Sequence, residues 1–153
     1  MDFSIREFNK DDFPAWSKLW RGYLDFYDSE VAEHVYESSW QRLLSEEPNE
    51  FKGLAAVSND GRMLGITHYL FHRHGWKIED VCYLQDLYVE DDARGLGVGR
   101  ALIEAVYAHA DDHGCSQVYW LTQEDNASAR VLYDRVADLT SFIKYQRNFD
   151  NKK

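Results

Sequence analysis

The sequence contains few cysteines, no long apolar run and no basic cluster of any size. Its two cysteines, Cys82 and Cys115, form no Cys-x-x-Cys pair, which argues against a disulfide framework or a zinc cage. The longest charge-free stretches, such as residues 63–71, fall far short of the roughly 20 apolar residues that cross a bilayer. The first residues lack the basic and apolar blocks of a secretory signal. We therefore expect a cytoplasmic protein with no membrane segment and no bound metal.

Basic residues are outnumbered by acidic ones. Lys and Arg together number 17 against 27 Asp and Glu, a formal net charge of -10, and Lys152 with Lys153 forms only a minor basic cluster. Binding to a nucleic-acid backbone needs a basic face, so DNA and RNA are not expected partners. An acidic surface instead attracts cations, although solubility alone also accounts for such a charge. A small cationic molecule is the partner that this composition favours.

The length and apolar content are those of one compact domain. The chain has 153 residues, of which 44% are hydrophobic and 15% aromatic. A folded chain of this length buries roughly 70% of its extended surface, which is enough for a core without disulfides. We expect a single domain over residues 1–153, in which residues 148–153 form a disordered tail.

Apolar periodicity and turn residues predict the elements of the first half. In order, these are a strand near residues 3–8, a helix from residue 13 to residue 27, a helix over 31–44, and strands over 51–57 and 63–71. The last two strands should form a hairpin, because the turn Ser58-Asn59-Asp60-Gly61 tolerates positive φ angles.

The second half continues with a mixture of strands and helices. The patterns predict a strand over 81–89, a helix over 97–113, a strand over 117–121, a helix over 126–136 and a last strand over 139–147. The order β-α-α-β-β-β-α-β-α-β combines hairpins with a βαβ crossover. The predicted class is therefore α/β (α+β) with a mixed sheet.

A glycine-rich turn separates the strand over 81–89 from the helix that follows it. Gly95, Gly97 and Gly99 occupy alternate positions, so backbone N–H groups can converge there on an anion that also feels the helix dipole. The alternative is a glycine turn that serves packing only. Neither the Walker pattern nor the G-x-G-x-x-G dinucleotide pattern fits this run. A phosphate or pyrophosphate of another kind of ligand is the expected occupant.

Two motifs resemble those of the GNAT N-acetyltransferase superfamily. Arg94-x-x-Gly97-x-Gly99, preceded by the strand, resembles the loop that binds the pyrophosphate of acetyl-CoA. Residues 126–133, with the sequence Asn-Ala-Ser-Ala-Arg-Val-Leu-Tyr, are similar to the N-x-x-A-x-x-L-Y segment of the superfamily. Segments around residues 83–89 and 114–117 look like the diamine acetyltransferase branch, and those at 118–120 and 132–137 look more like the fungal histone and polyamine acetyltransferase group.

The resemblance implies a GNAT-like fold, in which helices flank a mixed, mostly antiparallel central sheet, and acetyl-CoA as co-substrate. The residues that it implies in binding acetyl-CoA are Leu87, Tyr88, Val89, Arg94, Gly95, Leu96, Gly97, Val98, Gly99, Arg100 and Asn126. It also implies that the Tyr133 hydroxyl lies near the thioester sulfur. A phenol with a pKa of about 10 is suited to protonate a departing thiolate, so Tyr133 is the expected general acid.

The general base stays unassigned, because the sequence departs from its relatives there. The diamine branch carries a glutamate two positions before Leu87, whereas this chain has Gln85, which cannot accept a proton at neutral pH. Asp86 should point to the opposite face if strand alternation holds. Tyr27 and Tyr36 are candidates for the wall of an amine pocket, alongside Gln85 and Asp86. Other possible bases, each with a plain structural or solvated alternative, are His68, His72, Asp25, Asp28, Glu30 and Glu33.

The leading hypothesis is direct transfer of an acetyl group from acetyl-CoA to a primary amine of a small substrate, such as a polyamine or an amino acid. One alternative is a histone-like acetyltransferase of protein lysines. Another is a non-catalytic acyl-CoA-binding sensor, against which the presence of both Asn126 and Tyr133 argues. The related groups also imply a homodimer, for which the expected strand over 139–147 offers a pairing edge.

Overall fold

The computed structural model describes residues 2–149, in two compact units that divide after Leu121. The first unit contains β1 (Phe3–Glu7), the 3-10 turn η1 (Lys10–Asp12), α1 (Phe13–Phe26), α2 (Glu33–Leu43), β2 (Lys52–Ser58), β3 (Met63–His72), β4 (Val81–Val89), the 3-10 turn η2 (Asp91–Ala93), α3 (Val98–His113) and β5 (Val118–Tyr119). The second unit contains α4 (Ala127–Val136). Each unit is described by itself.

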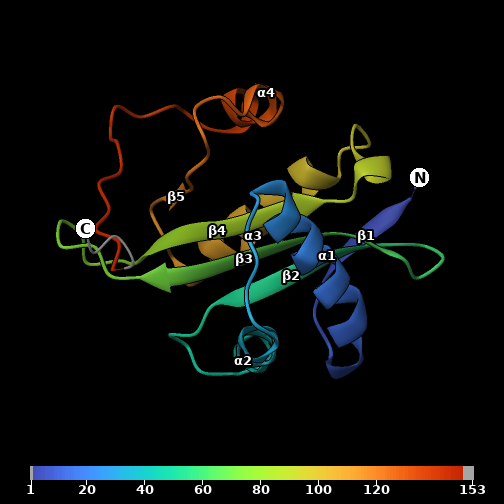
Figure 1. Ribbon diagram of the computed structural model, residues 1–153. Coiled ribbons are helices and arrows are strands. Elements are labelled where there is room, and N and C mark those ends of the chain that lie inside the picture. Colours follow the sequence, from blue (N-terminus) through green and yellow to red (C-terminus); the bar gives the residue numbers. More distant parts are fainter. Residues whose placement is uncertain (1, 150–153) are drawn as a thin grey trace. The chain divides into compact units, whose positions relative to one another are not determined.

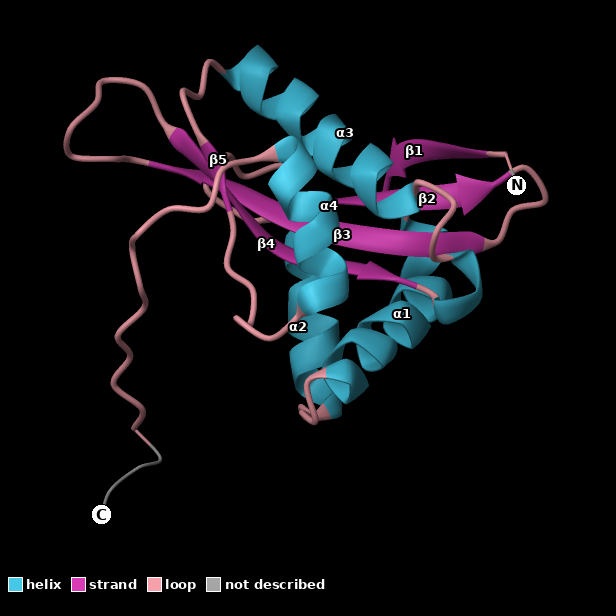
Figure 2. Cartoon of the chain, turned by 90° about the horizontal axis from the view of Figure 1, so that it is seen from above, coloured by secondary structure: helices cyan, strands magenta, loops and turns pink. Residues whose placement is uncertain are grey.

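The first unit is built around a five-stranded sheet with the order β1-β2-β3-β4-β5 (Figure 1). All neighbours are antiparallel except β4 and β5, which are parallel. Figure 2 shows α1 and α2 on one face of this sheet and α3 on the other. This arrangement confirms the predicted mixed, mostly antiparallel sheet flanked by helices.

The face under α1 and α2 carries a core rich in aromatic rings. Trp16 on α1 is fully buried, and Tyr36, Trp40 and Leu43 on α2 are each less than a tenth exposed. The Trp16 ring lies 5.2 Å from that of Trp40 and 6.1 Å from that of Tyr36, centroid to centroid. Removing a buried tryptophan ring from such a core typically costs about 3–5 kcal/mol, so these rings hold α1 firmly on the sheet.

The opposite face is covered by the apolar stripe of α3. Leu102, Ile103 and Val106 have no exposed surface, and they recur at helical spacing. Gly65 on β3 lies directly under this helix, because a Cβ built there would come within 3.1 Å of Leu102 and Val98. The packing fixes the direction of α3, and with it the position of its N-terminus.

The start of α1 is defined by local polar contacts. The Asn9 side chain accepts a hydrogen bond from the Asp11 backbone N–H, and the Asp12 carboxylate accepts one from the Asn9 backbone N–H at 2.8 Å. Arg6 binds Asp12 through both guanidinium ends, at 2.7 and 3.1 Å. This ion pair ties β1 to the helix start and holds the pKa of Asp12 below its usual range.

Most predicted elements are confirmed within a residue or two at each end, and the last strand is the exception. Residues 139–147 contain no helix or strand, and Leu139, Phe142 and Ile143 are about four-fifths exposed, at 77%, 82% and 78%. Alternation alone does not make a strand, because each backbone group also needs a partner on a neighbouring strand. The predicted tail shows neither helix nor strand at residues 148 and 149, and the rest of it lies outside the described residues.

Two further expectations concern the number of domains and the lack of a membrane-spanning segment. The expectation of one domain over the whole chain stays a prediction, because the two units are described separately. Among residues 2–149, no helix is both long enough and apolar enough to cross a membrane.

Candidate active site

The glycine turn takes the form that an anion-binding helix start requires. Gly95 and Gly97 have φ angles of 80° and 84°, a region that side-chain-bearing residues seldom enter. Nothing lies within 4 Å of a Cβ built on either residue. The preference for glycine therefore comes from the backbone conformation, and the space above the turn is open. Gly97 is the N-cap of α3 and provides no side-chain cap, and the first turn carries no acidic residue. The first N–H groups of α3 are thus left for a ligand.

The two arginines of the turn are held by neighbours of opposite charge. Arg94 donates to the Val89 carbonyl at 3.0 Å and pairs with Asp91 at 2.8 Å. Arg100 pairs with Glu104 one helical turn later, at 3.4 Å. Both side chains are about half exposed, at 46% and 52%, so each can still offer N–H groups to an anion at the turn.

The strand that leads into this turn has one edge without a strand partner. β4 pairs with β3 along its length, but its pairing with β5 is limited to Cys82 with Val118 and Tyr83 with Tyr119. Beyond Tyr83, none of the strands within residues 2–149 pairs with the β5 side of β4. The edge next to Leu87 and Val89 therefore has backbone groups that an extended ligand can pair with.

A β-bulge interrupts β4 immediately before Leu87. His68 of β3 pairs with Asp86, but the next residue, Tyr69, pairs with Leu84, so Gln85 is the extra residue. Such a bulge reverses the alternation of side chains. Gln85 is exposed, and Asp86 turns toward the face covered by α1, the same face that Tyr83 occupies. The regular alternation on which the expected direction of Asp86 depended is thus broken at Gln85.

Asp86 belongs to a buried hydrogen-bonded chain. Its Oδ2 lies 2.9 Å from Nδ1 of His68, and Nε2 of His68 accepts a hydrogen bond from the Trp16 indole at 3.0 Å. Burial raises the pKa of Tyr23, and the negative charge of nearby Asp86 raises it further. His68 is only 1% exposed, which makes it one of the few buried polar side chains of the described chain.

A row of aromatic side chains on α1 leads from the core to Asp86. Trp16 stacks on Trp20 with centroids 6.1 Å apart, Trp20 stacks on Tyr23 at 4.7 Å, and Tyr23 lies 5.1 Å from Tyr27. We call these four residues the aromatic row. The helix comes close to β4 beside it, because a Cβ on Gly22 would lie 2.5 Å from the Tyr88 hydroxyl. Gly22 therefore permits the approach that brings Tyr23 to Asp86.

Three tyrosines respond to the charge of Asp86. Burial raises the pKa values of Tyr23, Tyr27 and Tyr83, and the nearby negative charge of Asp86 raises them further. These phenols therefore stay neutral at physiological pH. Tyr83 also stacks on Tyr119 at 4.8 Å.

The other sequence candidates occupy different surroundings. Tyr36 is 4% exposed and packs in the core, so it lines no pocket. His72 lies 2.7 Å from the Tyr119 hydroxyl through Nε2. Glu33 is exposed at the start of α2.

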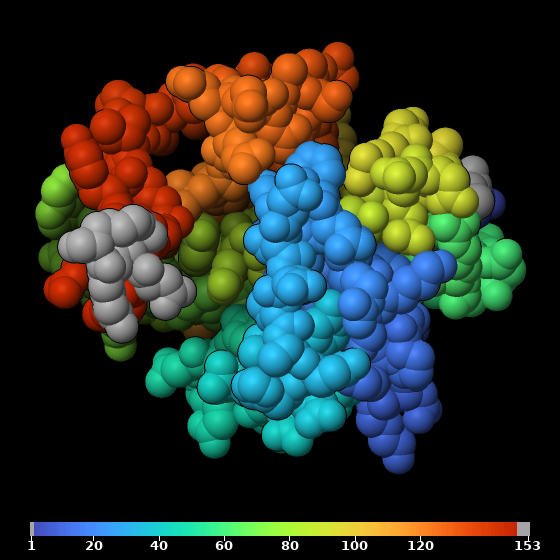
Figure 3. All heavy atoms as spheres, in the orientation of Figure 1, coloured from blue at the N-terminus to red at the C-terminus, as the bar shows by residue number. Residues whose placement is uncertain are grey.

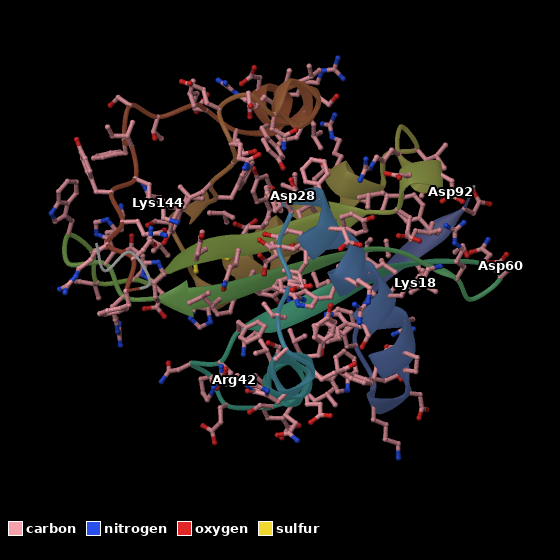
Figure 4. All side chains as sticks on the ribbon, viewed as in Figure 1. Lys18, Asp28, Arg42, Asp60, Asp92 and Lys144 are labelled. Carbon is pink, nitrogen blue, oxygen red and sulfur yellow. The ribbon has the colours of Figure 1, made fainter. Side chains whose placement is uncertain are left out.

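The connection between α1 and α2 carries the acidic candidates. An open hollow of about 520 Å³ is lined there by Asp25, Asp28, Ser29 and Glu30. This connection, light blue in Figure 3, runs over the surface in front of the sheet, and Figure 4 marks Asp28 on it. The three carboxylates make this part of the surface strongly negative.

A larger hollow, of about 610 Å³, lies elsewhere in the first unit. Its lining includes Phe8, Leu43 and the last turn of α3 at His109 and His113. The last turn of α3 is roughly 22 Å from its first turn at 1.5 Å per residue. Volume alone therefore does not identify the site, and the glycine turn with Asp86 carries the recognisable chemistry. Among the described residues, no group of three or more His, Cys, Asp or Glu side chains is placed to hold a metal ion.

The second unit carries the remaining two candidates on one helix. Asn126 stands at the N-cap of α4, and its side-chain amide donates to the Thr122 hydroxyl at 3.3 Å. Tyr133 follows seven residues later, which is about two helical turns. Both candidates thus belong to α4 or its N-cap.

Sequence reasoning missed the chain of Trp16, His68 and Asp86. Trp16 and His68 are 52 positions apart, and no local pattern announces a hydrogen bond between them. The β-bulge that turns Asp86 toward them likewise has no glycine or proline to signal it. The one signal in the sequence was the presence of a titratable histidine and a titratable aspartate within two mostly apolar strands.

The sequence profile of the acetyltransferase (GNAT) family matches residues 6–137. The chain therefore belongs to the GNAT family of acetyltransferases, and it is an N-acetyltransferase of that type. This membership agrees with the sheet, the glycine turn and the partly unpaired β4.

Relatives and solved structures extend the comparison. The chain is 38% identical over 144 residues to the D-amino-acid N-acetyltransferase HPA3 of Saccharomyces cerevisiae, covering 94% of this chain and 89% of that protein. It is 36% identical over 80 residues to the thialysine N-epsilon-acetyltransferase of Bos taurus, which is 51% of this chain and 46% of that protein. The structure of AAC(6')-Iy in complex with the bisubstrate analog CoA-S-monomethyl-acetylneamine has a TM-score of 0.82 at 18% identity, covering 97% of this chain and 99% of that one. At this identity the structural likeness shows the fold alone.

Proposed function

We propose that the protein transfers an acetyl group from acetyl-CoA to the primary amine of a small cationic molecule, within a complex of both substrates. The observation that carries the proposal is the uncapped start of α3, which follows β4 after the short turn η2. The glycine turn offers backbone N–H groups to a pyrophosphate, and β4 has a free edge beside it. A donor that combines a pyrophosphate with an extended amide arm matches both features.

Residues of this chain divide the binding of acetyl-CoA among them. The N–H groups from Gly95 to Arg100 hold the pyrophosphate, and the backbone of Leu87 and Val89 pairs with the pantetheine arm. Asn126 contributes a further hydrogen bond from α4. Bound acetyl-CoA supplies an activated thioester, for which Tyr133 is the expected proton donor at the sulfur.

Small amines are supported by the relatives and by the charge of the chain. The relatives described above act, by their names, on D-amino acids and thialysine. The net charge of -10 favours encounter with a cation, and the acidic hollow between α1 and α2 adds to this on the side of Asp86. A protein lysine offers the same ammonium group, so a basic peptide belongs in the substrate test.

The test is a coupled assay for thiol release. Purified protein is mixed with acetyl-CoA and, in turn, with polyamines, D- and L-amino acids, an aminoglycoside and a basic peptide. We expect amine-dependent release of CoA with at least one small amine and an initial-rate pattern of intersecting lines. Saturable CoA binding without turnover of any amine would instead favour the acyl-CoA sensor, and preference for the peptide would favour a protein-lysine acetyltransferase.

A further inference from the structure

The hydrogen bonds of His68 determine which of its nitrogens carries the proton. The indole Nε1 of Trp16 can only donate, so Nε2 of His68 must accept at 3.0 Å. The proton of a neutral imidazole is then on Nδ1, which faces Oδ2 of Asp86 at 2.9 Å. His68 thus donates to the carboxylate in the one tautomer that satisfies both neighbours.

The same contacts argue against His68 as the proton acceptor. A second proton would have to go to Nε2, which is already occupied by the Trp16 N–H in a buried environment, and the indole would then lose its partner. The side chain of His68 is 2% exposed, whereas that of Asp86 is 12% exposed. Asp86 is therefore the member of the pair that an incoming molecule can reach.

The surroundings of Asp86 suit an ammonium group. A carboxylate forms charge-assisted hydrogen bonds with a cation, and aromatic faces add cation–π attraction. The charge of Asp86 raises the pKa values of Tyr23 on α1, Tyr27 at its C-cap and Tyr83 on its own strand, so these aromatic side chains lie near the carboxylate. Asp86 also directly precedes Leu87, beside the free edge of β4.

We propose that Asp86 is the catalytic base that takes a proton from the substrate ammonium, and that His68, held as the Nδ1–H tautomer by Trp16, is a positioning residue for its carboxylate. This inference rests on the proposed function and assigns the base that the sequence left open.

The proton and electron balance of the reaction is complete with this assignment. The ammonium gives one proton to Asp86, and the freed nitrogen lone pair forms the C–N bond at the thioester carbonyl. The intermediate collapses with cleavage of the C–S bond, and the thiolate takes a proton from the Tyr133 hydroxyl. Tyr133 recovers a proton from the nitrogen, which becomes the amide. Asp86 releases its proton to water, so one proton leaves for each acetyl group transferred.

The titratable groups around Asp86 allow a clear test by pH. They are His68 on β3, Tyr23 on α1, Tyr27 at its C-cap and Tyr83 on β4. Tyr119 of β5 stacks on Tyr83, and His72 of β3 contacts Tyr119. Burial raises the pKa values of all four tyrosines, so they remain neutral between pH 7 and pH 9. The contribution of His72 is identified by measuring the pH profile of kcat/KM again in the His72→Gln variant.

The main experiment compares wild type with Asp86→Asn on two acceptors, the amine that is turned over best and a β-fluorinated analogue of lower amine pKa. At pH 7 we expect Asp86→Asn to lower kcat/KM for the parent amine by about 100-fold or more. The loss should shrink about tenfold per pH unit as the amine becomes neutral, and should be smaller for the analogue. Asp80→Asn is the matched control, because Asp80 also pairs with a histidine, His113 at 3.0 Å, away from β4's free edge.

A second experiment examines the tautomer of His68 by 15N NMR of labelled imidazoles. Wild type should show a protonated Nδ1 and an unprotonated Nε2. Trp16→Phe should mix the two tautomers and lower kcat while CoA affinity by calorimetry stays constant. Trp20→Phe is the control, because the Trp20 ring also packs beside His68, at 5.1 Å between centroids, but its buried Nε1 has no hydrogen-bond partner; in this variant Nδ1 of His68 should stay protonated and Nε2 unprotonated.

The outcomes separate this inference from the proposed function. An Asp86→Asn loss that is equal at every pH and for both amines would assign Asp86 to cation binding and overturn its role as base. Wild-type kinetics in Asp86→Asn would overturn the role as base and exclude cation binding as well. A protonated Nε2 of His68 in wild type would overturn the positioning role. Should Asp86→Asn not fold, Asp86→Ser is measured in its place. If wild type binds no CoA and turns over no amine, the proposed function itself fails.

Discussion

At the scale of single residues, burial decides which reactive side chains a substrate can reach. Asp86 keeps some exposure and accepts a hydrogen bond from His68, whereas Tyr36 is enclosed in the core. Cys82, like Tyr36, is enclosed in the core, and it has no exposed surface. Burial, and to a smaller degree nearby Cys115, raises the pKa of the Cys82 thiol to about 12.

Cys82 is therefore expected to be unreactive in the folded protein. Iodoacetamide at pH 8 should modify Cys115 first, because its thiol is partly exposed and only the thiolate reacts. Incubation with acetyl-CoA alone should yield no acetyl-Cys82 by peptide mass spectrometry. An acetylated Cys82 peptide would exclude direct transfer and indicate a covalent intermediate.

Tyr133 is expected to act through its hydroxyl group. Replacing Tyr133 with Phe removes the proton donor and keeps the ring, so kcat should fall by at least about tenfold while CoA affinity stays nearly constant. Tyr145→Phe is the matched control, because Tyr145 belongs to the same unit and is 90% exposed. Unchanged turnover in Tyr133→Phe would exclude this tyrosine as the acid.

At the scale of elements, function depends on how strands and helices begin and end. After β4 and η2, the glycine turn leaves the start of α3 uncapped, and the bulge in β4 turns Asp86 toward His68. The turn η1, which leads into α1, begins at a capping box that an ion pair from β1 supports. Each of these ends can be tested by a single substitution.

Gly97→Val should strongly weaken CoA binding measured by calorimetry. Gly97 has a φ of 84°, so valine would be strained there by roughly 1–2 kcal/mol and would place a branched side chain over the anion site. Gly61→Val provides the control, because Gly61 has a φ of 92° in the turn between β2 and β3. It introduces the same strain away from the turn, and its CoA affinity should remain that of wild type. Equal affinities in the two variants would refute the pyrophosphate site.

Asp12→Asn should lower the free energy of unfolding by about 1 kcal/mol at pH 7, an amount that allows for the exposure of Arg6. The hydrogen bond from Arg6 lowers the pKa of folded Asp12. The stabilisation is thus fully present above the unfolded pKa of about 4 and is lost as pH falls through the folded pKa. Urea unfolding should show the difference at pH 7 and none at strongly acidic pH. Asp11→Asn, at the exposed neighbouring residue, is the control. If Asp12→Asn still lowers the free energy of unfolding at strongly acidic pH, the loss has a cause other than the ion pair with Arg6.

At the scale of the whole molecule, the second unit exposes several large apolar side chains that no contact within the described residues of a single chain covers. Phe142, Ile143 and Tyr145 are each more than three-quarters exposed. Apolar side chains gathered in this way are typical of surfaces that another protein covers.

A homodimer remains our prediction for the protein in solution. Light scattering should give twice the chain mass at micromolar concentration, and a variant that ends at residue 138 should give a smaller assembly, because it lacks the exposed apolar segment. A monomeric mass for the full chain at tens of micromolar would contradict the prediction.

The sequence by itself determined the order of elements, the glycine turn and the family, because these depend on residues close together in the chain. Helical spacing in α1 and α3, the hairpin turn at Gly61 and the positive φ at Gly97 are all local requirements. Only the tertiary structure decided the direction of Asp86, the tautomer of His68 and the absence of a strand over residues 139–147. A bulge depends on the register between two strands, a tautomer depends on partners 52 and 18 positions away, and a strand depends on a neighbour to pair with. These are properties of packing between distant segments, which local patterns do not contain.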